Sequence, residues 1–284
     1  MKMRIFMLAF CVGFVFFFSA AAIFVYRYSG SAASTPEDAE SSAPEVFAKN
    51  ATLLLIFEED GAAGPFSLVC FDAENGRIPV LTFPAGAVFE SAAGAPTAAE
   101  AFAALSHDDF AAAAEKELGI GISGWFIWNR STCEAVMAKA GSFDYILPES
   151  LHYSGGGRYI DLSAGVQSIT GKKLYDLVTY PNFDESARCD ITSRLLSLFF
   201  GKRLRRFLPE NSALSAAVYE STENSADAFY RAELRSTIKA LCSGKSAIAS
   251  HVTCDLEDGG DGRLLFSTAT RTRLQKYFPA KETE

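Results

Sequence analysis

The fold of this chain is decided by four stretches between Leu118 and Pro181. They read LGIGISGWFIWN (118–129), GSFDYILPESLHY (141–153), GGRYIDLSAGVQSITG (156–171) and KLYDLVTYP (173–181). Each stretch joins a short apolar run to a boundary that contains Gly or Pro, which is typical of strands and helices that alternate along a chain. This alternation predicts an α/β fold, with a mixed central sheet flanked by helices.

The residues before these stretches extend the same pattern. TLLLIF at 52–57 predicts a buried strand, and 65–72 with 77–84 predict a hairpin whose turn, AENG, contains Asn75 and Gly76. Thr97 and Glu100 have the spacing of a capping box. We expect helices at 97–106, 108–118 and 131–139, with Ser131 as the cap of the third, and a strand within 120–129.

The later residues predict further elements. Strands are expected at 143–147 and 159–162, and 165–172 is interpreted as a break before a helix near 173–178. A long helix over 187–207 and another over 226–241 should follow. The C-terminal part predicts a strand pair formed by 251–255 and 263–267.

An apolar run precedes the folded part. Residues 5–26 contain no charged side chain, and 22 residues in a helix span about 33 Å, against about 30 Å of bilayer hydrocarbon. Lys2 and Arg4 precede the run and Arg27 follows it, which places the N-terminus in the cytoplasm. We therefore expect a single-pass anchor in residues 1–28. A cleaved signal peptide is the alternative, although its apolar region is usually shorter.

The composition separates a tether from a folded domain. Residues 29–50 are rich in Ser, Ala, Pro and Glu, which favours a disordered linker, and 51–284 are expected to form one extracytoplasmic domain. The chain has 26 Lys and Arg, three of them in residues 1–28, which leaves 23 bases against 34 acids and a net charge of −11 beyond the anchor. This acidic balance excludes general nucleic-acid binding.

The order and spacing of the four stretches resemble the LytR-CpsA-Psr family, from 52 to 278 overall and most strongly from 118 to 181. The resemblance implies a membrane anchor followed by an extracytoplasmic α/β domain that holds a polyprenyl pyrophosphate lipid. It also implies transfer of envelope glycopolymers from that lipid to the cell wall. The implied partner is thus a polyprenyl-linked glycan or a cell-wall polymer, and the implied cofactor of an active member is Mg²⁺.

The charged residues of the family motifs are largely replaced. The family has Ile-Pro-Arg-Asp-Thr after the hairpin, where this chain has Phe83 to Ala87, and an acid precedes the hairpin where this chain has Gly64 and Pro65. Thr179 and Pro181 occupy the positions of a Tyr-x-Arg-x-Arg-like pair. Because arginine forks bind phosphate and Mg²⁺ needs oxygen ligands, these replacements predict a degenerate site without a metal or other cofactor.

Some candidate residues remain. Arg188 matches the first arginine of the family's Gly-Asp-x-x-Arg-x-x-Arg-Gln motif, so it is the catalytic and substrate-binding candidate, although it could instead pair with Asp184 or Asp190. Tyr180 and Phe183 suit a lipid groove or a core. Lys202 and Arg203, with Arg205 and Arg206, form a basic cluster that fits either a solvated helix end or contact with anionic lipid or wall polymer.

Two aspartates and the five cysteines beyond the anchor indicate a functional role less specifically. Asp72 and Asp184 could coordinate a cation, although turn and helix-cap roles are commoner for aspartate. Cys70, Cys133, Cys189, Cys242 and Cys254 have no zinc spacing, and their odd number leaves a free thiol in a monomer.

Three functions are therefore open. The first is a degenerate family member that binds a lipid-linked glycan or a partner, the second is an active phosphotransferase that uses Arg188, and the third is an anchored interaction domain without lipid binding.

Overall fold

The computed structural model describes residues 50–59, 61–94, 96–207, 218–243, 247–260 and 263–280. The expected anchor at 5–26 and all of the tether except Asn50 lie outside these residues. Within the described ranges, no helix is long and apolar enough to cross a membrane. The chain divides into two units, 1–46 and 47–284, and the following concerns the second.

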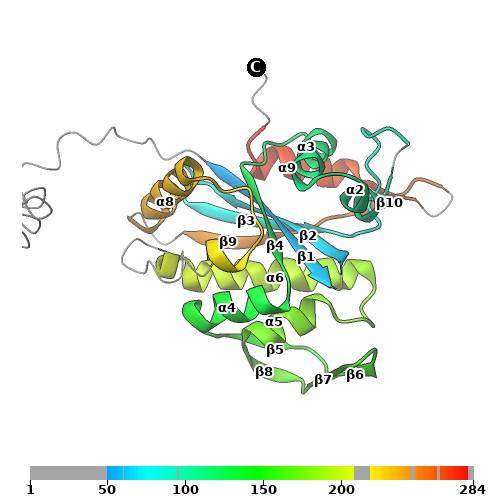
Figure 1. Cartoon of the computed structure of the whole chain (residues 1–284), viewed down its shortest axis with the longest axis vertical. Helices are drawn as coiled ribbons and strands as arrows, with labels where there is room; N and C mark the ends of the chain where they lie inside the picture. The colour runs from blue at the N-terminus through cyan, green and yellow to red at the C-terminus, as the bar shows by residue number, and fades with distance from the viewer. Residues whose placement is uncertain are drawn as a thin grey trace, which may run out of the picture. The chain divides into compact units, whose positions relative to one another are not determined.

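The centre of the domain is a five-stranded mixed sheet in the order β4-β1-β2-β3-β9 (Figure 1). Strand β2 is antiparallel to both of its neighbours, whereas β1 is parallel to β4 and β3 is parallel to β9. Strands β1, β3, β4 and β9 therefore all end at one edge of the sheet, which we call the carboxyl edge. The strands are β1 (Ala51–Glu59), β2 (Ala62–Phe71), β3 (Arg77–Phe83), β4 (Gly124–Trp128) and β9 (Ile248–Val252).

The predicted hairpin is confirmed. Gly76 has φ of 63°, a left-handed value that glycine adopts without steric cost. The Asp72 carboxylate accepts hydrogen bonds from the Asn75 backbone N–H at 3.0 Å and from Arg77 Nε at 2.6 Å. Asp72 thus has a turn role, the commoner of the two roles considered for it.

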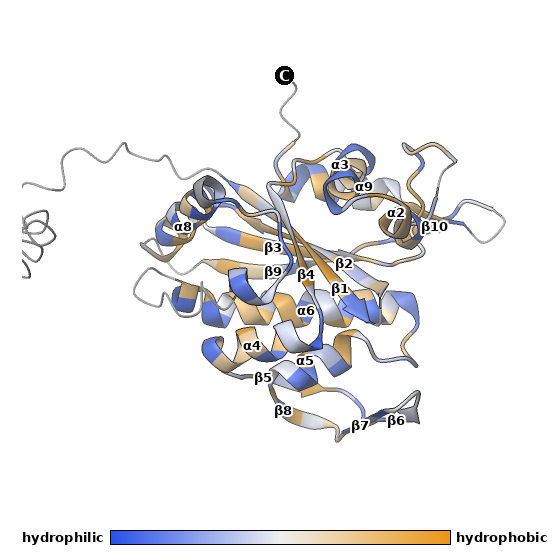
Figure 2. Ribbon diagram, viewed as in Figure 1, coloured by the Kyte–Doolittle hydropathy of each residue, from blue (hydrophilic) through white to orange (hydrophobic). Residues whose placement is uncertain are grey.

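Helices cover both faces of the sheet (Figure 1). One face packs against α2 (Ala98–Ala104), α3 (His107–Leu118) and α9 (Thr268–Tyr277) through a core that includes Phe66, Phe83 and Phe110. The other face packs against α4 (Arg130–Ala140), α5 (Gly171–Val178), α6 (Glu185–Arg203) with the 3-10 turn η2 (Leu204–Phe207), and α8 (Ala228–Ser243). Long apolar stretches of β1 and β4 can be followed in Figure 2, as expected for strands that are buried on both faces.

The helix boundaries agree with the capping signals. Thr97 and Glu100 form the predicted capping box of α2, and Gly119 ends α3 in a left-handed conformation with φ of 67°. For α4 the expected cap is wrong by two residues, because Asn129 and not Ser131 accepts the Thr132 N–H, at 3.0 Å. Strand β4, Gly124–Trp128, lies within the range 120–129 expected for a strand.

The strands expected at 143–147 and 159–162 exist but do not join the central sheet. They are β5 (Phe143–Leu147) and β7 (Arg158–Leu162), which pair with β8 (Gly165–Ile169) and β6 (Leu151–Gly155) in two separate ribbons. The break expected at 165–172 is therefore wrong over 165–169. Residues in such ribbons are half exposed, so their apolar signal is weak.

The expected C-terminal strand pair is also wrong. The strand near 251–255 is β9, which pairs with β3, and the partner of β11 (Leu264–Phe266) is β10 (Leu256–Asp258). Helix α9 was not predicted, because six of its ten residues, TATRTRLQKY, are Thr, Arg or Lys. Leu274 nevertheless anchors it fully buried in the core.

Candidate functional site

Family motifs converge at the carboxyl edge of the sheet. Helix α5 ends before Thr179, Pro181 follows in the connecting turn, and Asp184 begins α6 by accepting the Ala187 N–H at 2.7 Å. Gly86, in the segment after β3, lies beside Glu185 at this start of α6. Asp184 thus has a helix-capping role, the commoner of the two roles considered for it.

Arg188 is held by the backbone of this turn. Its Nη2 donates to the carbonyl oxygens of Tyr180 at 3.1 Å and Phe183 at 3.3 Å. The guanidinium group therefore stabilises the α5–α6 connection, and its buried Nε–H has no partner among the described residues.

Tyr180 and Phe183 lie beside Arg188, so the structure brings these three candidates together. Tyr180 is buried, its hydroxyl donates to the His152 carbonyl at 2.9 Å, and its ring centroid lies 4.8 Å from that of Phe183. Phe183 packs partly buried against the same core. Both aromatic rings therefore pack in the turn between α5 and α6, against the core on the α6 side of the sheet.

At two of the replaced motif positions, Gly64 and the Ala85–Gly86 segment, this chain supplies no charged side chain. A Cβ at Gly64 would lie 2.9 Å from the Phe57 carbonyl oxygen, so an acidic side chain does not fit there. A Cβ at Gly86 would lie 2.8 Å from Oε2 of Glu185, so this segment faces a carboxylate. Ala85 and Gly86 supply no oxygen ligand to Mg²⁺. The residues of this segment therefore do not fit the family's metal ion.

Lys202 and Arg203 lie at the other end of α6. Fourteen residues separate Arg188 from Lys202, which is about 21 Å along a helix. Lys202 Nζ is 3.4 Å from the Asp144 carbonyl oxygen, and Arg203 donates to the Ser142 carbonyl. The structure thus separates these two cations from the Arg188 site, and both neighbour the start of β5.

A second polar cluster next to the motif positions was missed by the sequence analysis. Asp176 on α5 is almost fully buried, and its carboxylate is contacted by Arg130 at 2.9 Å, Lys172 at 2.6 Å and Arg158 at 3.8 Å. Arg158 also pairs with Glu59, and its Nη2 donates to Thr179 Oγ1 at 2.8 Å. The guanidinium group beside Thr179 thus belongs to Arg158 of β7, whereas the family motif has an arginine near the end of α5.

The three cations of this cluster, Arg130, Arg158 and Lys172, line an open cleft of about 810 Å³ at the carboxyl edge. The guanidinium groups of Arg130 and Arg158 lie 5.1 and 5.8 Å from the Tyr175 ring centroid. Glu58 and Glu134 also line the cleft, so its charges are mixed and largely paired. In the sequence, the Lys172 to Asp176 spacing of four residues was the available signal.

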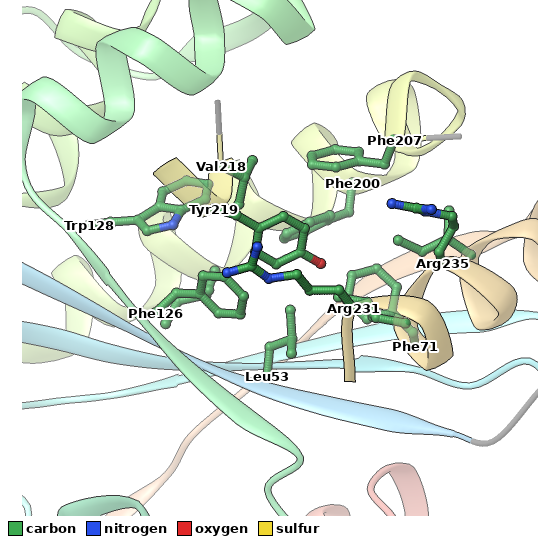
Figure 3. A pocket seen from close by; sticks show the side chains of 13 residues that line it. Leu53, Phe71, Phe126, Trp128, Phe200, Phe207, Val218, Tyr219, Arg231 and Arg235 are labelled. Carbon is green, nitrogen blue, oxygen red and sulfur yellow. The ribbon is translucent and has the colours of Figure 1, made fainter. Parts of the chain in front are cut away.

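An apolar cavity lies on the α6 side of the sheet, between the sheet, η2 and α8 (Figure 3). Its volume is about 50 Å³, enough for a few water-sized molecules. Leu53, Phe126 and Trp128 line it from the sheet, and Arg231 and Arg235 of α8 contribute its charged part. Trp128 Nε1 is buried without a hydrogen-bond partner among the described residues.

Comparison by sequence finds no matching protein-family model and no matching curated protein. Comparison by structure finds solved proteins that cover most of this domain. A protein from Eubacterium siraeum, described as a transcription regulator, has a TM-score of 0.71 at 14% identity, over 86% of this chain and 96% of its own. A LytR-Csp2A-Psr enzyme from Actinomyces oris has a TM-score of 0.61 at 14% identity, over 81% and 90%.

TagT, in a structure with bound LI-WTA, has a TM-score of 0.60 at 15% identity, over 83% of this chain and 92% of its own. The chain therefore has the fold of the LytR-CpsA-Psr proteins, as the spacing of its four stretches predicted. At these identities the likeness is one of fold.

Proposed function

We propose that this chain is a membrane-anchored, extracytoplasmic protein of cell-envelope glycopolymer assembly. In this proposal it binds a polyprenyl-linked glycan or a partner enzyme and does not transfer the glycan. The fold shared with TagT, whose structure contains LI-WTA, supports the connection to glycopolymers. Residues 5–26 would form the anchor, with the N-terminus in the cytoplasm.

The observation that carries the loss of transfer is the position of the Glu185 carboxylate beside Gly86. The resemblance places arginine and aspartate at Ala85 and Gly86, yet the carboxylate of Glu185 lies within 2.8 Å of a Cβ built at Gly86. A carboxylate there repels a pyrophosphate, and nearby Arg188 is already engaged by two carbonyl oxygens. Both features weaken phosphate binding at the point where transfer requires it.

Lipid binding does not depend on these charges. The apolar cavity beside α8 can receive part of an isoprenoid chain if α8 and η2 move apart, and each buried CH₂ contributes about 0.8 kcal/mol. The neighbouring Arg231 and Arg235 would favour an anionic lipid.

The activity test uses the purified full-length chain in detergent, Mg²⁺ and a polyprenyl pyrophosphate. We expect negligible cleavage, and little rescue when Ala85→Arg and Gly86→Asp are combined, because residues that act as one unit are far from additive. Robust turnover that Arg188→Ala abolishes would instead establish the phosphotransferase.

Mass spectrometry of co-purified lipid tests binding separately. We expect bound polyprenyl lipid that is lost when Ile238→Phe fills the cavity, with the melting temperature retained. Leu105→Phe, at an exposed position on the other face, is the matched control and should retain the lipid. Absence of lipid from the unaltered chain would favour an anchored interaction domain.

The orientation of the anchor is tested in intact cells. Protease added outside should degrade the chain beyond about residue 29, because the apolar run and its flanking bases place the domain outside. A C-terminal tag that stays protected, while an N-terminal tag is cleaved, would contradict this orientation.

A further inference from the structure

Strand β9 lies at an edge of the central sheet. Within the described residues it pairs with β3 alone, and the Ile248 N–H donates to the Gly76 carbonyl at 3.1 Å. In a parallel ladder alternate residues direct both backbone groups to the same neighbour. The backbone groups of Ala249, His251 and Thr253 therefore point away from the sheet.

Part of this outward-pointing row of backbone groups is available for hydrogen bonding to another chain. The Thr253 carbonyl accepts a hydrogen bond from Arg273 at 3.1 Å, which covers the end of the strand. The structure gives the backbone groups of Ala249 and His251 no hydrogen-bond partner in the described ranges. The β9 sequence, IASHV, carries neither the lysine nor the proline that commonly protects an edge strand, and Ile248 is 70% exposed.

A groove of about 550 Å³ follows this edge, between β9 and α9. Arg273, Lys276 and Tyr277 line it from α9, Ser250 and His251 line it from β9, and Thr253 lines it just after the strand. No acidic residue is among its described lining residues. Arg273 pairs with Asp255 at 2.5 Å just beyond the strand, and Lys276 lies 5.0 Å from the Tyr277 ring centroid. Because Arg273 is already paired, Lys276 is the cation of the groove that has no acidic partner among the described residues, in a chain whose net charge is −8.

We propose that this groove binds an extended acidic peptide segment of a partner protein, which adds to the sheet along β9. The outward N–H and C=O groups of Ala249 and His251 would bond the main chain of the peptide, and Lys276 would pair with its acidic side chains. The aligned backbone groups favour a peptide over an anionic glycan or polyphosphate, which has no matching row of alternating donors and acceptors. This inference does not depend on lipid binding or transfer.

The test uses the full-length chain in detergent and the blocked peptide Val-Glu-Val-Glu-Val-Glu-Val. We expect saturable binding, with at least tenfold slower hydrogen exchange at the Ala249 and His251 amides. Lys276→Glu should weaken binding about tenfold at low salt, whereas Lys139→Glu, on α4 at the opposite face, should not. The same peptide with lysine in place of glutamate should bind weakly.

A second variant addresses the backbone directly. Ala249→Pro removes one outward N–H without removing a bond to β3, so it should weaken peptide binding while near-UV circular dichroism confirms the fold. The proposal is overturned if the acidic peptide leaves both amides unprotected, or if Lys276→Glu binds it as well as the original chain. It is also overturned if poly(glycerol phosphate) displaces the peptide and protects the same amides, since the groove would then bind polyanions generally.

Discussion

At the scale of single residues, Gly171 shows how closely α4 and α5 are packed. A Cβ built at Gly171 would meet the backbone of α4 at the Cys133 carbonyl oxygen and Glu134 Cα, and would lie 2.6 Å from the Cys133 carbonyl carbon. Backbone atoms cannot rotate away as a side chain can. The first residue of α5 must therefore be glycine. This close packing of α5 against α4 is what brings Asp176 into contact with its cationic partners.

We expect Gly171→Ala to lower the free energy of unfolding by about 1–3 kcal/mol, the usual cost of overpacking. Urea denaturation measures this change. Gly201→Ala on α6 is the matched control, because its Cβ would meet only the Ala249 methyl, at 3.2 Å, and alanine gains helix propensity of about 1 kcal/mol. Equal effects of both substitutions would show that α4 and α5 are not in such close contact.

At the scale of elements, the predicted and observed structures agree where local signals are strong. Thr97 with Glu100, and Gly119, set the ends of α2 and α3 through contacts within a few residues, so they could be predicted. The pairing of β9 with β3 joins residues about 170 positions apart, and β5 and β8 pair without a short turn between them. No local pattern specifies such partners, which explains the wrong strand pair at the C-terminus.

The hairpin turn provides the test at this scale. Gly76→Val should lower the free energy of unfolding by about 1 kcal/mol or more, because a β-branched residue resists the φ of 63° found there. Gly76→Asn should cost less, since asparagine tolerates the left-handed region. Thermal melting of the two variants side by side checks this order, and equal melting temperatures for Val and Asn would contradict the turn geometry.

At the scale of the whole molecule, the candidate site combines predicted and unpredicted parts. Arg188, Tyr180 and Phe183 lie within nine residues of each other, so their proximity followed from the sequence. The Arg130, Arg158, Lys172 and Asp176 cluster draws on α4, β7 and α5, and it exists because the β6–β7 ribbon folds back onto α5. Such a cluster depends on tertiary packing, so only its Lys172–Asp176 pair had a local signature.

The burial of several cysteine thiols makes the stability of the domain sensitive to alkaline pH. Burial raises the pKa of the Cys70 and Cys254 thiols from 9.0 to about 12, and raises the pKa of Cys133 and Cys189 still further. In the unfolded chain these thiols ionise near their ordinary pKa. Their contribution to stability is therefore fully present below about pH 9 and is lost as pH rises toward the folded-state values.

We expect the free energy of unfolding to fall above about pH 9, with each buried thiol adding up to about 1.4 kcal/mol per pH unit to the slope. Urea denaturation between pH 8 and 11 measures the slope. Cys133→Ala should lower the free energy of unfolding at every pH, because it leaves a cavity. It should also make the decrease of stability with pH less steep, by up to the contribution of one thiol, because the buried thiol is gone. Cys242→Ala removes a partly exposed thiol and should change the slope less. A slope that Cys133→Ala leaves unchanged would mean that its thiol ionises as readily in the folded domain as in the unfolded chain, contrary to its complete burial between α4 and the sheet.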